Sequence, residues 1–424
     1  MPARHLAFIL LALLLPASLI LTGCANSDDA ASAQLESPTV LLISLDGFRS
    51  DYLDRYEAPT MRRLAAEGVR AERMIPSFPS KTFPNHYTLV TGLYPENHGI
   101  VANTMYDPEF DAWFSLGNRD AVSDGRWWGG EPLWVTMEKR GMKTATFFWP
   151  GSEAEIMGTR PSYWLPFDGD LPAADRVEQI FEWLNLPAEE RPSFITLYFS
   201  DVDHAGHDFG PDAPETAEAV RTVDGYIEML VEGLEARGLL DEINLIIVSD
   251  HGMVPTSSER VIFLDDYIDL DDVMVVDYTP VAMIRPKEGK FDTVYQALQA
   301  AEHAHFYRKD EVPDSFHFQD HHRIPDLIGI AEEGWSITTH TYFENNPSSF
   351  DGGTHGYNNY LPSMGALFIA RGPAFVQGET VGPFSNIHVY NLMTAILGVP
   401  PASVDGSLDA VRPLLAPQVT ANVE

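Results

Sequence analysis

The sequence has little cysteine and little positive charge. Of its 424 residues only Cys24 is a cysteine, so the rest of the chain can form neither a disulfide nor a thiolate metal site. Lysine and arginine number 27 against 62 aspartates and glutamates, and the formal net charge is −35. Such a chain lacks the basic surface that binds long nucleic acids or anionic membranes. A small phosphorylated substrate is not excluded, because bound metal ions reverse the local charge.

The N-terminal segment has the pattern of an export signal. Arg4 precedes an almost unbroken apolar run from Leu6 to Leu21, and small residues follow it. A charged start, an apolar run and a small-residue cleavage site predict a signal peptide over residues 1–23. The alternative is an uncleaved membrane anchor, but the run is short for a span and contains Pro16.

Cys24 closes a Leu-Thr-Gly-Cys sequence that resembles the bacterial lipobox, in which the cysteine becomes the lipidated first residue. We therefore expect lipidation at Cys24 and a small, polar tether over residues 24–37. The protein is then an exported lipoprotein on the periplasmic face of a bacterial membrane, which it contacts only through the lipid. Ala25, in place of aspartate, favours sorting to the outer membrane.

Apolar runs and helical periodicity alternate along the rest of the chain, which is long enough for one large core. Continuous apolar runs typical of strands buried on both faces cover 39–45, 194–200, 243–249 and 366–370, and helical patterns cover 59–68, 213–238 and 387–397. This order predicts an α/β fold with a mostly parallel central sheet and helices on both faces. We expect one catalytic domain over 38–416 and a tail over 417–424. The less regular segments 100–170 and 255–355 are expected to form a cap or insertions.

Several of the predicted strands end in acidic residues: Asp46, the pair Asp201 and Asp203, and Asp250. Ligands of open α/β sheets collect at the carboxyl ends of strands. One aspartate in such a position is often only a helix cap or a turn residue. Several such ends in one chain, two of them with histidine alongside, favour a functional site.

Three histidines accompany these carboxylates. His207 follows Asp203 by four residues, with a glycine between them that we expect to allow a close turn, and His251 directly follows Asp250. His355 lies in a glycine-rich loop, where the backbone can approach an ion closely. Carboxylates and imidazoles without cysteine suit catalytic zinc, and there are enough ligands for two Zn²⁺.

Thr82 is the candidate nucleophile. It precedes a helix-like stretch from Tyr87 to Gly92, so its hydroxyl alone is more typical of a helix cap. A metal ion bound to the hydroxyl changes this interpretation, because it stabilises the alkoxide at neutral pH. Lys81 either neutralises an incoming phosphate or is merely solvated, and the sequence leaves both open.

The motifs around these residues resemble the nucleotide pyrophosphatase/phosphodiesterase family of the alkaline phosphatase superfamily. The matching segments are Leu45-Asp-Gly-Phe-Arg49, Pro79-Ser-Lys-Thr-Phe-Pro-Asn-His-Tyr87, Gly92-Leu-Tyr-Pro-Glu-Asn-His-Gly99 and Ser249-Asp-His-Gly252. The resemblance runs from about Val40 to Leu415. It implies an alkaline-phosphatase-like α/β fold in which small insertions form the substrate side.

The resemblance also implies a role for each site residue. One zinc is held by Asp46, Thr82, Asp250 and His251, and the second by Asp203, His207 and His355. Asn103 donates to a phosphate oxygen, and Phe83 stacks on the nucleobase. Asp201 and His204 fall outside the ligand set. The aromatic residues Tyr163 and Phe167 are candidates for the opposite side of the base slot, although each is equally consistent with a place in the core.

The implied reaction is zinc-dependent hydrolysis of nucleotide phosphodiester and pyrophosphate bonds. It proceeds through a covalent phospho-threonine and releases nucleoside 5′-monophosphates from nucleotides, dinucleotides or nucleotide sugars. We expect a monomer. The eukaryotic members carry disulfide-rich and nuclease-like domains that this sequence does not have.

Three alternatives stay open. A phosphomonoesterase or phosphonate hydrolase of the superfamily uses the same metals but needs positive groups around the phosphate, and no arginine is evident near the nucleophile. A choline-type lipid phosphodiesterase needs further acidic and aromatic residues in a choline pocket, and so acidic a chain can supply them. A surface lipoprotein that binds metal without turnover is disfavoured by the complete set of a nucleophile, two metal sites and an oxyanion donor.

Overall fold

The computed structural model describes Leu35 and residues 37–420. The predicted signal peptide, Cys24, almost all of the tether and residues 421–424 lie outside the described residues. Within the described part of the chain, no helix is both long and apolar enough to cross a membrane.

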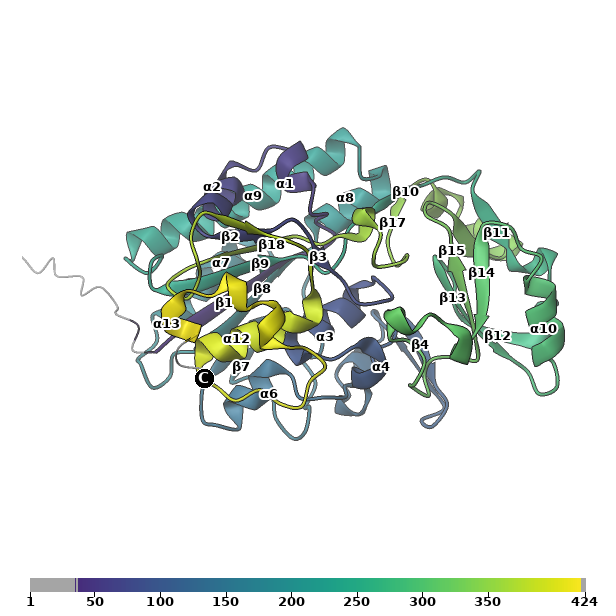
Figure 1. The fold of residues 1–424 in the computed structure, drawn as a ribbon, viewed down its shortest axis with the longest axis horizontal. Helices are drawn as coiled ribbons and strands as arrows, with labels where there is room; N and C mark the ends of the chain where they lie inside the picture. Colours follow the sequence, from purple (N-terminus) through teal and green to yellow (C-terminus); the bar gives the residue numbers. More distant parts are fainter. Residues whose placement is uncertain (1–34, 36, 421–424) are drawn as a thin grey trace, which may run out of the picture. The chain divides into compact units, whose positions relative to one another are not determined.

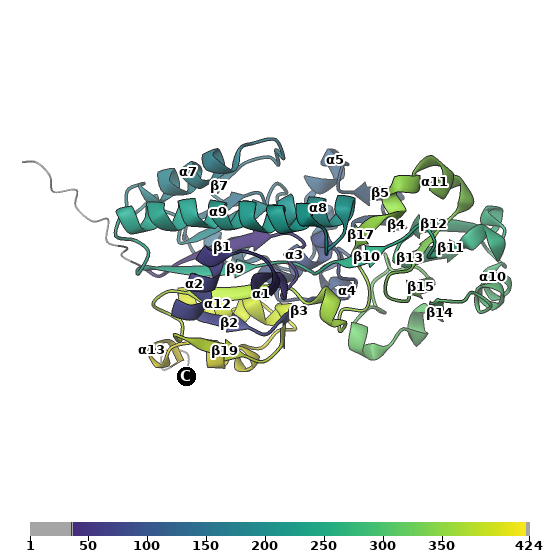
Figure 2. The same ribbon diagram turned by 90° about the horizontal axis from the view of Figure 1, so that it is seen from above.

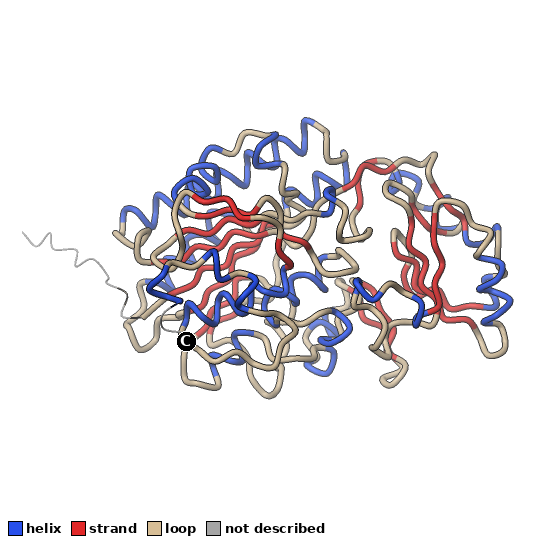
Figure 3. Tube along the Cα trace, viewed as in Figure 1, coloured by secondary structure: helices blue, strands red, loops and turns tan. Residues whose placement is uncertain are grey.

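A central sheet of eight strands forms the middle layer (Figures 1 and 3). In order across the sheet the strands are β19 (Glu379–Val381), β2 (Val69–Ala71), β18 (Phe368–Arg371), β9 (Ile243–Val248), β1 (Thr39–Leu45), β8 (Phe194–Phe199), β6 (Thr144–Phe147) and β7 (Tyr163–Trp164). All neighbours are parallel except β18, which runs antiparallel to both β9 and β2. The predicted mostly parallel sheet is confirmed.

Strand β1 is buried on both faces, which explains its continuous apolar sequence. Because successive side chains point to opposite faces, Val40 and Leu42 join one core and Leu41 and Ile43 join the other. The first core includes residues of α3 (Thr82–Thr91) and α12 (Val389–Leu397), and the second includes residues of α2 (Pro59–Glu67), α7 (Ala173–Leu184) and α9 (Pro214–Ala236). Helices thus cover both faces of the sheet, as Figure 2 shows for α9 on one side and α12 on the other.

The predicted elements agree with β1, β8, β9, β18, α2, α9 and α12 to within two residues at each end. Strands β2, β6, β7 and β19 of the central sheet were not predicted, and β6 and β7 lie in the segment 100–170 that we expected to form insertions. Four residues in β6 and two in β7 are too few for a periodic signal. Helix α3 also begins earlier than expected, at Thr82, because Pro84 is tolerated in a first turn.

Residues between β9 and β18 form a second sheet with its own core, which is larger and more regular than the insertion we expected. Its strands, in order, are β12 (Val273–Asp277), β13 (Val281–Pro286), β15 (Leu327–Ala331) and β14 (Ala304–Arg308), all antiparallel, with α10 (Phe291–Leu298) alongside. The chain enters this second sheet through β10 (Val254–Thr256) and leaves it through β17 (Gly352–Thr354), and these two strands pair antiparallel. Figure 1 shows the second sheet beside the central one.

A hairpin of β4 (Thr104–Asp107) and β5 (Ala112–Ser115) contacts this second sheet. The buried Asp107 accepts a hydrogen bond from Arg323 Nε at 2.6 Å, and Arg323 lies in the loop before β15. Arg323 also donates to the carbonyls of Gly99 and Trp127, at 2.7 Å each. The ion pair therefore joins the loop of the second sheet to the chain just beyond Asn103.

Candidate active site

Two groups of candidate ligands meet at the carboxyl end of the central sheet. One group is Asp46, Asp250 and His251, and the other is Asp203, His207 and His355; within each group the candidate ligand atoms all lie within 4.8 Å of one another. Asp46 follows β1 and Asp250 follows β9, two strands that are neighbours in the sheet. The structure thus brings together all six carboxylates and histidines that the sequence nominated.

Asp203 and His207 lie on α8 (Asp201–Phe209), where a spacing of four residues puts both on one face. The glycine between them does not make the close turn we expected, because the helix continues through it. Gly206 instead allows close packing, since a Cβ there would lie 2.8 Å from Met253 Cε. Asp201 accepts a hydrogen bond from Tyr226 at 3.2 Å and belongs to neither ligand group.

His355 follows β17, and the two glycines of that strand have a different purpose from the one we expected. A Cβ on Gly352 would lie 2.1 Å from the His207 carbonyl oxygen, and one on Gly353 would lie 2.5 Å from that of Gly206. The glycines therefore let the strand lie directly against α8, not against an ion. This close approach brings His355 beside His207, with the ring centroids 5.0 Å apart.

The backbone orients each of the three histidines. The Nδ1 atoms of His207, His251 and His355 lie 2.8, 3.0 and 2.9 Å from the carbonyl oxygens of Gly353, Gly252 and Ser80. A carbonyl only accepts hydrogen bonds, so each Nδ1 must carry the proton. In the neutral ring each Nε2 then has a free lone pair, which is the arrangement that metal-ligating histidines adopt.

The carboxylates fit a divalent cation. Asp46 Oδ1, Asp203 Oδ1 and Asp250 Oδ2 are buried and have no hydrogen-bond partner among the described residues. The other oxygen of Asp46 accepts from Tyr198 at 2.6 Å, and that of Asp250 accepts from the Gly47 amide at 3.1 Å. Buried polar atoms are rarely left unpaired, so these three oxygens are placed as ligands are.

The charges of the site lead to the same conclusion. Burial, together with the nearby charges of Asp250 and Asp203, raises the pKa of Asp46 well above its ordinary value. Burial also lowers the pKa of His355 well below its ordinary value, and His251 and His207 add to the effect. The raised pKa of Asp46 reflects the crowding of buried carboxylates, and bound cations would relieve the repulsion between them.

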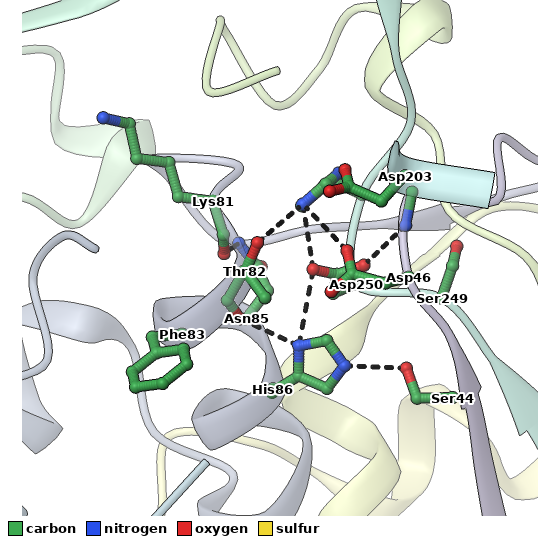
Figure 4. Close-up of polar contacts among 12 residues, drawn as sticks. Ser44, Asp46, Lys81, Thr82, Phe83, Asn85, His86, Asp203, Ser249 and Asp250 are labelled. Atoms are coloured by element: carbon green, nitrogen blue, oxygen red, sulfur yellow. Dashed lines mark hydrogen bonds and ion pairs between the residues drawn. The ribbon is translucent and has the colours of Figure 1, made fainter. Parts of the chain in front are cut away.

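Thr82 is the first residue of α3, and its hydroxyl does not cap the helix, because Lys81 is the residue at the cap position. Thr82 Oγ1 lies 3.4 Å from His251 Nε2, facing the Asp46 group (Figure 4). The simpler interpretation of Thr82 as a helix cap is therefore wrong. A hydroxyl that does not cap a helix and lies beside the ligand group is suited to nucleophilic attack.

His86 and Ser44 support the site but were not recognised in the sequence. His86 is fully buried, with Nδ1 2.9 Å from the Thr82 carbonyl oxygen and Nε2 2.7 Å from Ser44 Oγ. Its spacing of four from Thr82 places both on one face of a helix, and this is the signal that could have found it. The contact with Ser44 joins α3 to β1 across the site (Figure 4).

Asn103 and Phe83, to which the resemblance gives separate roles, are hydrogen-bonded neighbours. Asn103 Oδ1 accepts a hydrogen bond from the Phe83 amide at 2.9 Å, which leaves the amide NH₂ group of Asn103 as the donor that a phosphate oxygen needs. The Phe83 ring packs edge-on against Phe114, at 5.9 Å between centroids. Phe83 also lines a cavity of about 240 Å³.

The cavity opens beside Thr82 and is mostly apolar around Phe83. Its lining consists of Asp46, Thr82, Phe83, Leu116, Arg119, Val122, Phe148, Trp149, Pro150, Glu153, Phe167, Tyr198, Asp203 and His204. Phe167 is therefore in the cavity wall. The structure does not place Tyr163 there: it lies in β7 at the edge of the sheet, with its hydroxyl donating to Glu190.

The cavity beside Thr82 contains an arginine, although none was evident near the nucleophile in the sequence. Arg119 lines the same cavity as Thr82, which the sequence did not indicate because the two are far apart in the chain. Its guanidinium is already paired with the carboxylate of Glu153, which also lines the cavity. The pair places one positive and one negative group at the wall of the cavity.

Comparison with known proteins accounts for this arrangement. The family model of type I phosphodiesterase / nucleotide pyrophosphatase matches residues 40–358. The chain belongs to this family. The murine ectonucleotide pyrophosphatase/phosphodiesterase 5, solved as an inactive threonine-to-alanine variant in complex with AMP, has a TM-score of 0.85 at 37% identity and covers 89% of this chain and 100% of its own.

Two curated members of the phosphodiesterase family are similar over most of this chain. The mouse ectonucleotide pyrophosphatase/phosphodiesterase family member 1 is 40% identical over 399 residues, which are 90% of this chain but 43% of that protein. The bovine bis(5′-adenosyl)-triphosphatase ENPP4 is 38% identical over 97% of this chain and 89% of its own length. The chain thus spans less than half the length of the mouse relative.

Proposed function

We propose that the protein hydrolyses nucleotide phosphodiester and pyrophosphate bonds with Thr82 as nucleophile and releases nucleoside 5′-monophosphates. The observation that carries the proposal is the position of Thr82 Oγ1, 3.4 Å from His251 Nε2 at the mouth of a cavity that Phe83 and Phe167 line. When the phosphorus of a nucleotide lies beside Thr82, the base of that nucleotide can enter this apolar pocket.

Two Zn²⁺ ions are the cofactors that we propose. Asp46, Asp250, His251 and the Thr82 oxygen would hold one, and Asp203, His207 and His355 the other. Carboxylate and imidazole ligands without thiolate are typical of catalytic zinc. When bound, the two ions would lower the pKa of the attacking hydroxyl and stabilise charge on the phosphate oxygens.

The side chains around Thr82 have separate tasks in this reaction. Thr82 Oγ1 forms a bond to phosphorus while the bond from phosphorus to the leaving oxygen breaks, and the proton lost by the hydroxyl goes to the leaving oxygen through solvent. Water then attacks phosphorus, the bond from phosphorus to Thr82 Oγ1 breaks, and a proton from the water restores the Thr82 hydroxyl. Asn103 is held by the Phe83 amide so that its NH₂ group donates to a non-bridging oxygen in both steps.

The nucleotide part of the substrate occupies the cavity in this proposal. The bovine relative is named as a bis(5′-adenosyl)-triphosphatase, and AMP is bound in the murine structure. Stacking on Phe83 would stabilise a base by about 1–3 kcal/mol. We therefore propose nucleotides, dinucleotides and nucleotide sugars as the substrate class.

We further propose that the protein acts as an exported monomer with a lipid on Cys24, on the periplasmic face of the outer membrane. This part of the proposal rests on the N-terminal sequence alone. Mass spectrometry of the N-terminal peptide from membrane fractions tests it, because a diacylated or triacylated Cys24 is expected and a free thiol would contradict it.

The reaction is tested by steady-state hydrolysis, with zinc supplied, of the nitrophenyl ester of thymidine monophosphate beside nitrophenyl phosphate and nitrophenylphosphocholine. We expect a large preference for the nucleotide ester in kcat/KM. Thr82→Ala should lose turnover by about 10³-fold or more and still bind metal. Thr91→Ala is the matched control, because that hydroxyl donates only to the Tyr87 carbonyl of its own helix.

Other outcomes separate the competing functions. Preference for the monoester indicates a phosphomonoesterase, for which Arg119 offers a positive group if Glu153 releases it. Preference for the choline ester indicates a lipid-head-group phosphodiesterase. Full retention of function in Thr82→Ala would show that the protein is a metal-binding lipoprotein and not an enzyme.

A further inference from the structure

Lys81, directly before the nucleophile, is buried away from the cavity. The residue is 6% exposed, and its ammonium pairs with the carboxylate of Asp277, at the end of β12 in the second sheet. Lys81 is not part of the cavity wall, and Figure 4 shows its side chain extending away from Asp46, Asp203 and Asp250. A buried ammonium is stable only with such a partner.

The backbone of Lys81 determines where α3 starts. Its carbonyl accepts the first helical bond, from the Asn85 amide at 3.1 Å, and a second from Asn85 Nδ2 at 2.9 Å. Thr82 is the next residue, so any displacement of Lys81 moves the attacking oxygen with it. The ion pair therefore connects a strand of the second sheet to the position of the nucleophile.

Residues 355–357, in the segment that returns from the second sheet, contact residues 80 and 81. His355 Nδ1 donates to the Ser80 carbonyl at 2.9 Å, and Ser80 Oγ donates to the Tyr357 carbonyl at 2.9 Å. A Cβ on Gly356 would lie 3.2 Å from Lys81 Cε, so the glycine backbone packs on the lysine stem. Residues 80 and 81 are thus tied to the second sheet and to the strand that leaves it.

Asp277 owes its orientation to an irregularity in β12. The pairing of β12 with β13 shifts register between Val275 and Asp277, and such a bulge redirects the side chain that follows it. Asp277 Oδ1 also accepts a hydrogen bond from the Tyr278 amide at 3.0 Å, which fixes the carboxylate. Lys81 and Asp277 are therefore each oriented by further contacts beside the ion pair itself.

We propose that Lys81 and Asp277 are positioning residues: through this ion pair the second sheet sets the place of Thr82, and Lys81 does not bind the substrate phosphate. The inference rests on the proposed function in that Thr82 is taken as the nucleophile. It gives the second sheet a part in catalysis although it contributes no ligand to either metal group.

Single and double variants test the pair. We expect Lys81→Met and Asp277→Asn each to lower kcat by about 10- to 100-fold, with KM for the nucleotide ester within about twofold, because the nucleophile is displaced and not the binding pocket. The double variant should lose less than the product of the two single losses, since it leaves no unpaired charge. Lys290→Met, which breaks the exposed Lys290–Asp272 pair beside the same sheet, is the matched control and should keep kcat.

A phosphate-binding lysine would give the opposite pattern. Lys81→Met would then raise KM, Asp277→Asn would leave KM unchanged or lower it by freeing the ammonium, and the two effects would multiply in the double variant. That pattern would overturn the proposal.

Amide hydrogen exchange of the first turn of α3 tests the same inference without turnover. Asp277→Asn should speed exchange of the Asn85 amide relative to the unmodified chain and to Lys290→Met. Equal rates in all three overturn the inference, whatever the substrate. Absence of hydrolysis by the unmodified chain would instead contradict the proposed function alone.

Discussion

Single side chains orient the candidate ligand atoms, and Tyr198 is an example. Its hydroxyl donates to Asp46 Oδ2 at 2.6 Å, which leaves Oδ1 free for a cation. Burial and the charge of Asp46 raise the pKa of the Tyr198 phenol well above its ordinary value, so the hydroxyl stays a donor. The ring itself lines the cavity, and one residue thus serves both the metal site and the pocket.

Tyr198→Phe should weaken metal binding by about 10- to 100-fold, because hydrogen bonds to ligating carboxylates fix their orientation. The ring remains, so the cavity keeps its shape. Competition titration with a zinc chelator measures the affinity. Tyr226→Phe, which removes a hydrogen bond at 3.2 Å to Asp201 outside the ligand groups, is the control. Equal affinity in both variants would contradict the role of Tyr198.

The elements differ in how far the sequence specifies them. Strand β1 has a continuous apolar run and helix α9 has a long helical periodicity, and the bounds of both were predicted closely. The six candidate carboxylate and histidine ligands could be named, because five of them stand at strand ends or beside another ligand type and His355 lies in a glycine-rich loop. Tyr198 and Asp277 could not be assigned, because their roles depend on partners far away in the chain, as in the pair of Lys81 and Asp277, which are 196 positions apart.

Helix α2 shows another long-range dependence, since its first amides are capped by a different helix. Asp224 of α9 is buried and accepts from the amides of Thr60 and Met61 at 3.1 and 2.8 Å. Asp224→Ala should lower the free energy of unfolding by about 1–2 kcal/mol, because it removes a helix cap. Urea denaturation measures the change. Glu232→Ala, at an exposed position of the same helix, should have little effect.

At the scale of the whole molecule, the pair of Asp107 and Arg323 connects the hairpin to the second sheet. Burial raises the pKa of Asp107, but hydrogen bonds from Arg323 and His322 outweigh it and bring the pKa below its ordinary value. The carboxylate of Asp107 therefore binds a proton more readily in the unfolded chain than in the folded protein. This stabilisation is complete above the unfolded pKa of about 3.9 and is lost as the pH falls through the folded pKa.

Asp107→Asn should therefore be less stable at pH 7, by about 3 kcal/mol, because the buried Arg323 loses its counter-charge. The deficit should begin to shrink as the pH falls below about 4, where Asp107 becomes protonated in the unfolded chain before it does so in the folded one. Denaturation curves between pH 7 and pH 3 measure both effects. Asp111→Asn, at the exposed end of the same hairpin, should follow the unmodified chain, and a deficit independent of pH would contradict the assignment.

The late position of strand β18 in the chain has a consequence for folding during synthesis. Strand β2 is synthesised early, yet its neighbours in the sheet are β18 and β19, which come after residue 367. His355 is also late, while the other ligands lie before residue 252. Because the ribosome delivers the N-terminus first, the sheet and the metal site are completed last. A polypeptide truncated before residue 355 would lack a ligand and leave β9 as an open edge, where further chains can add and aggregate.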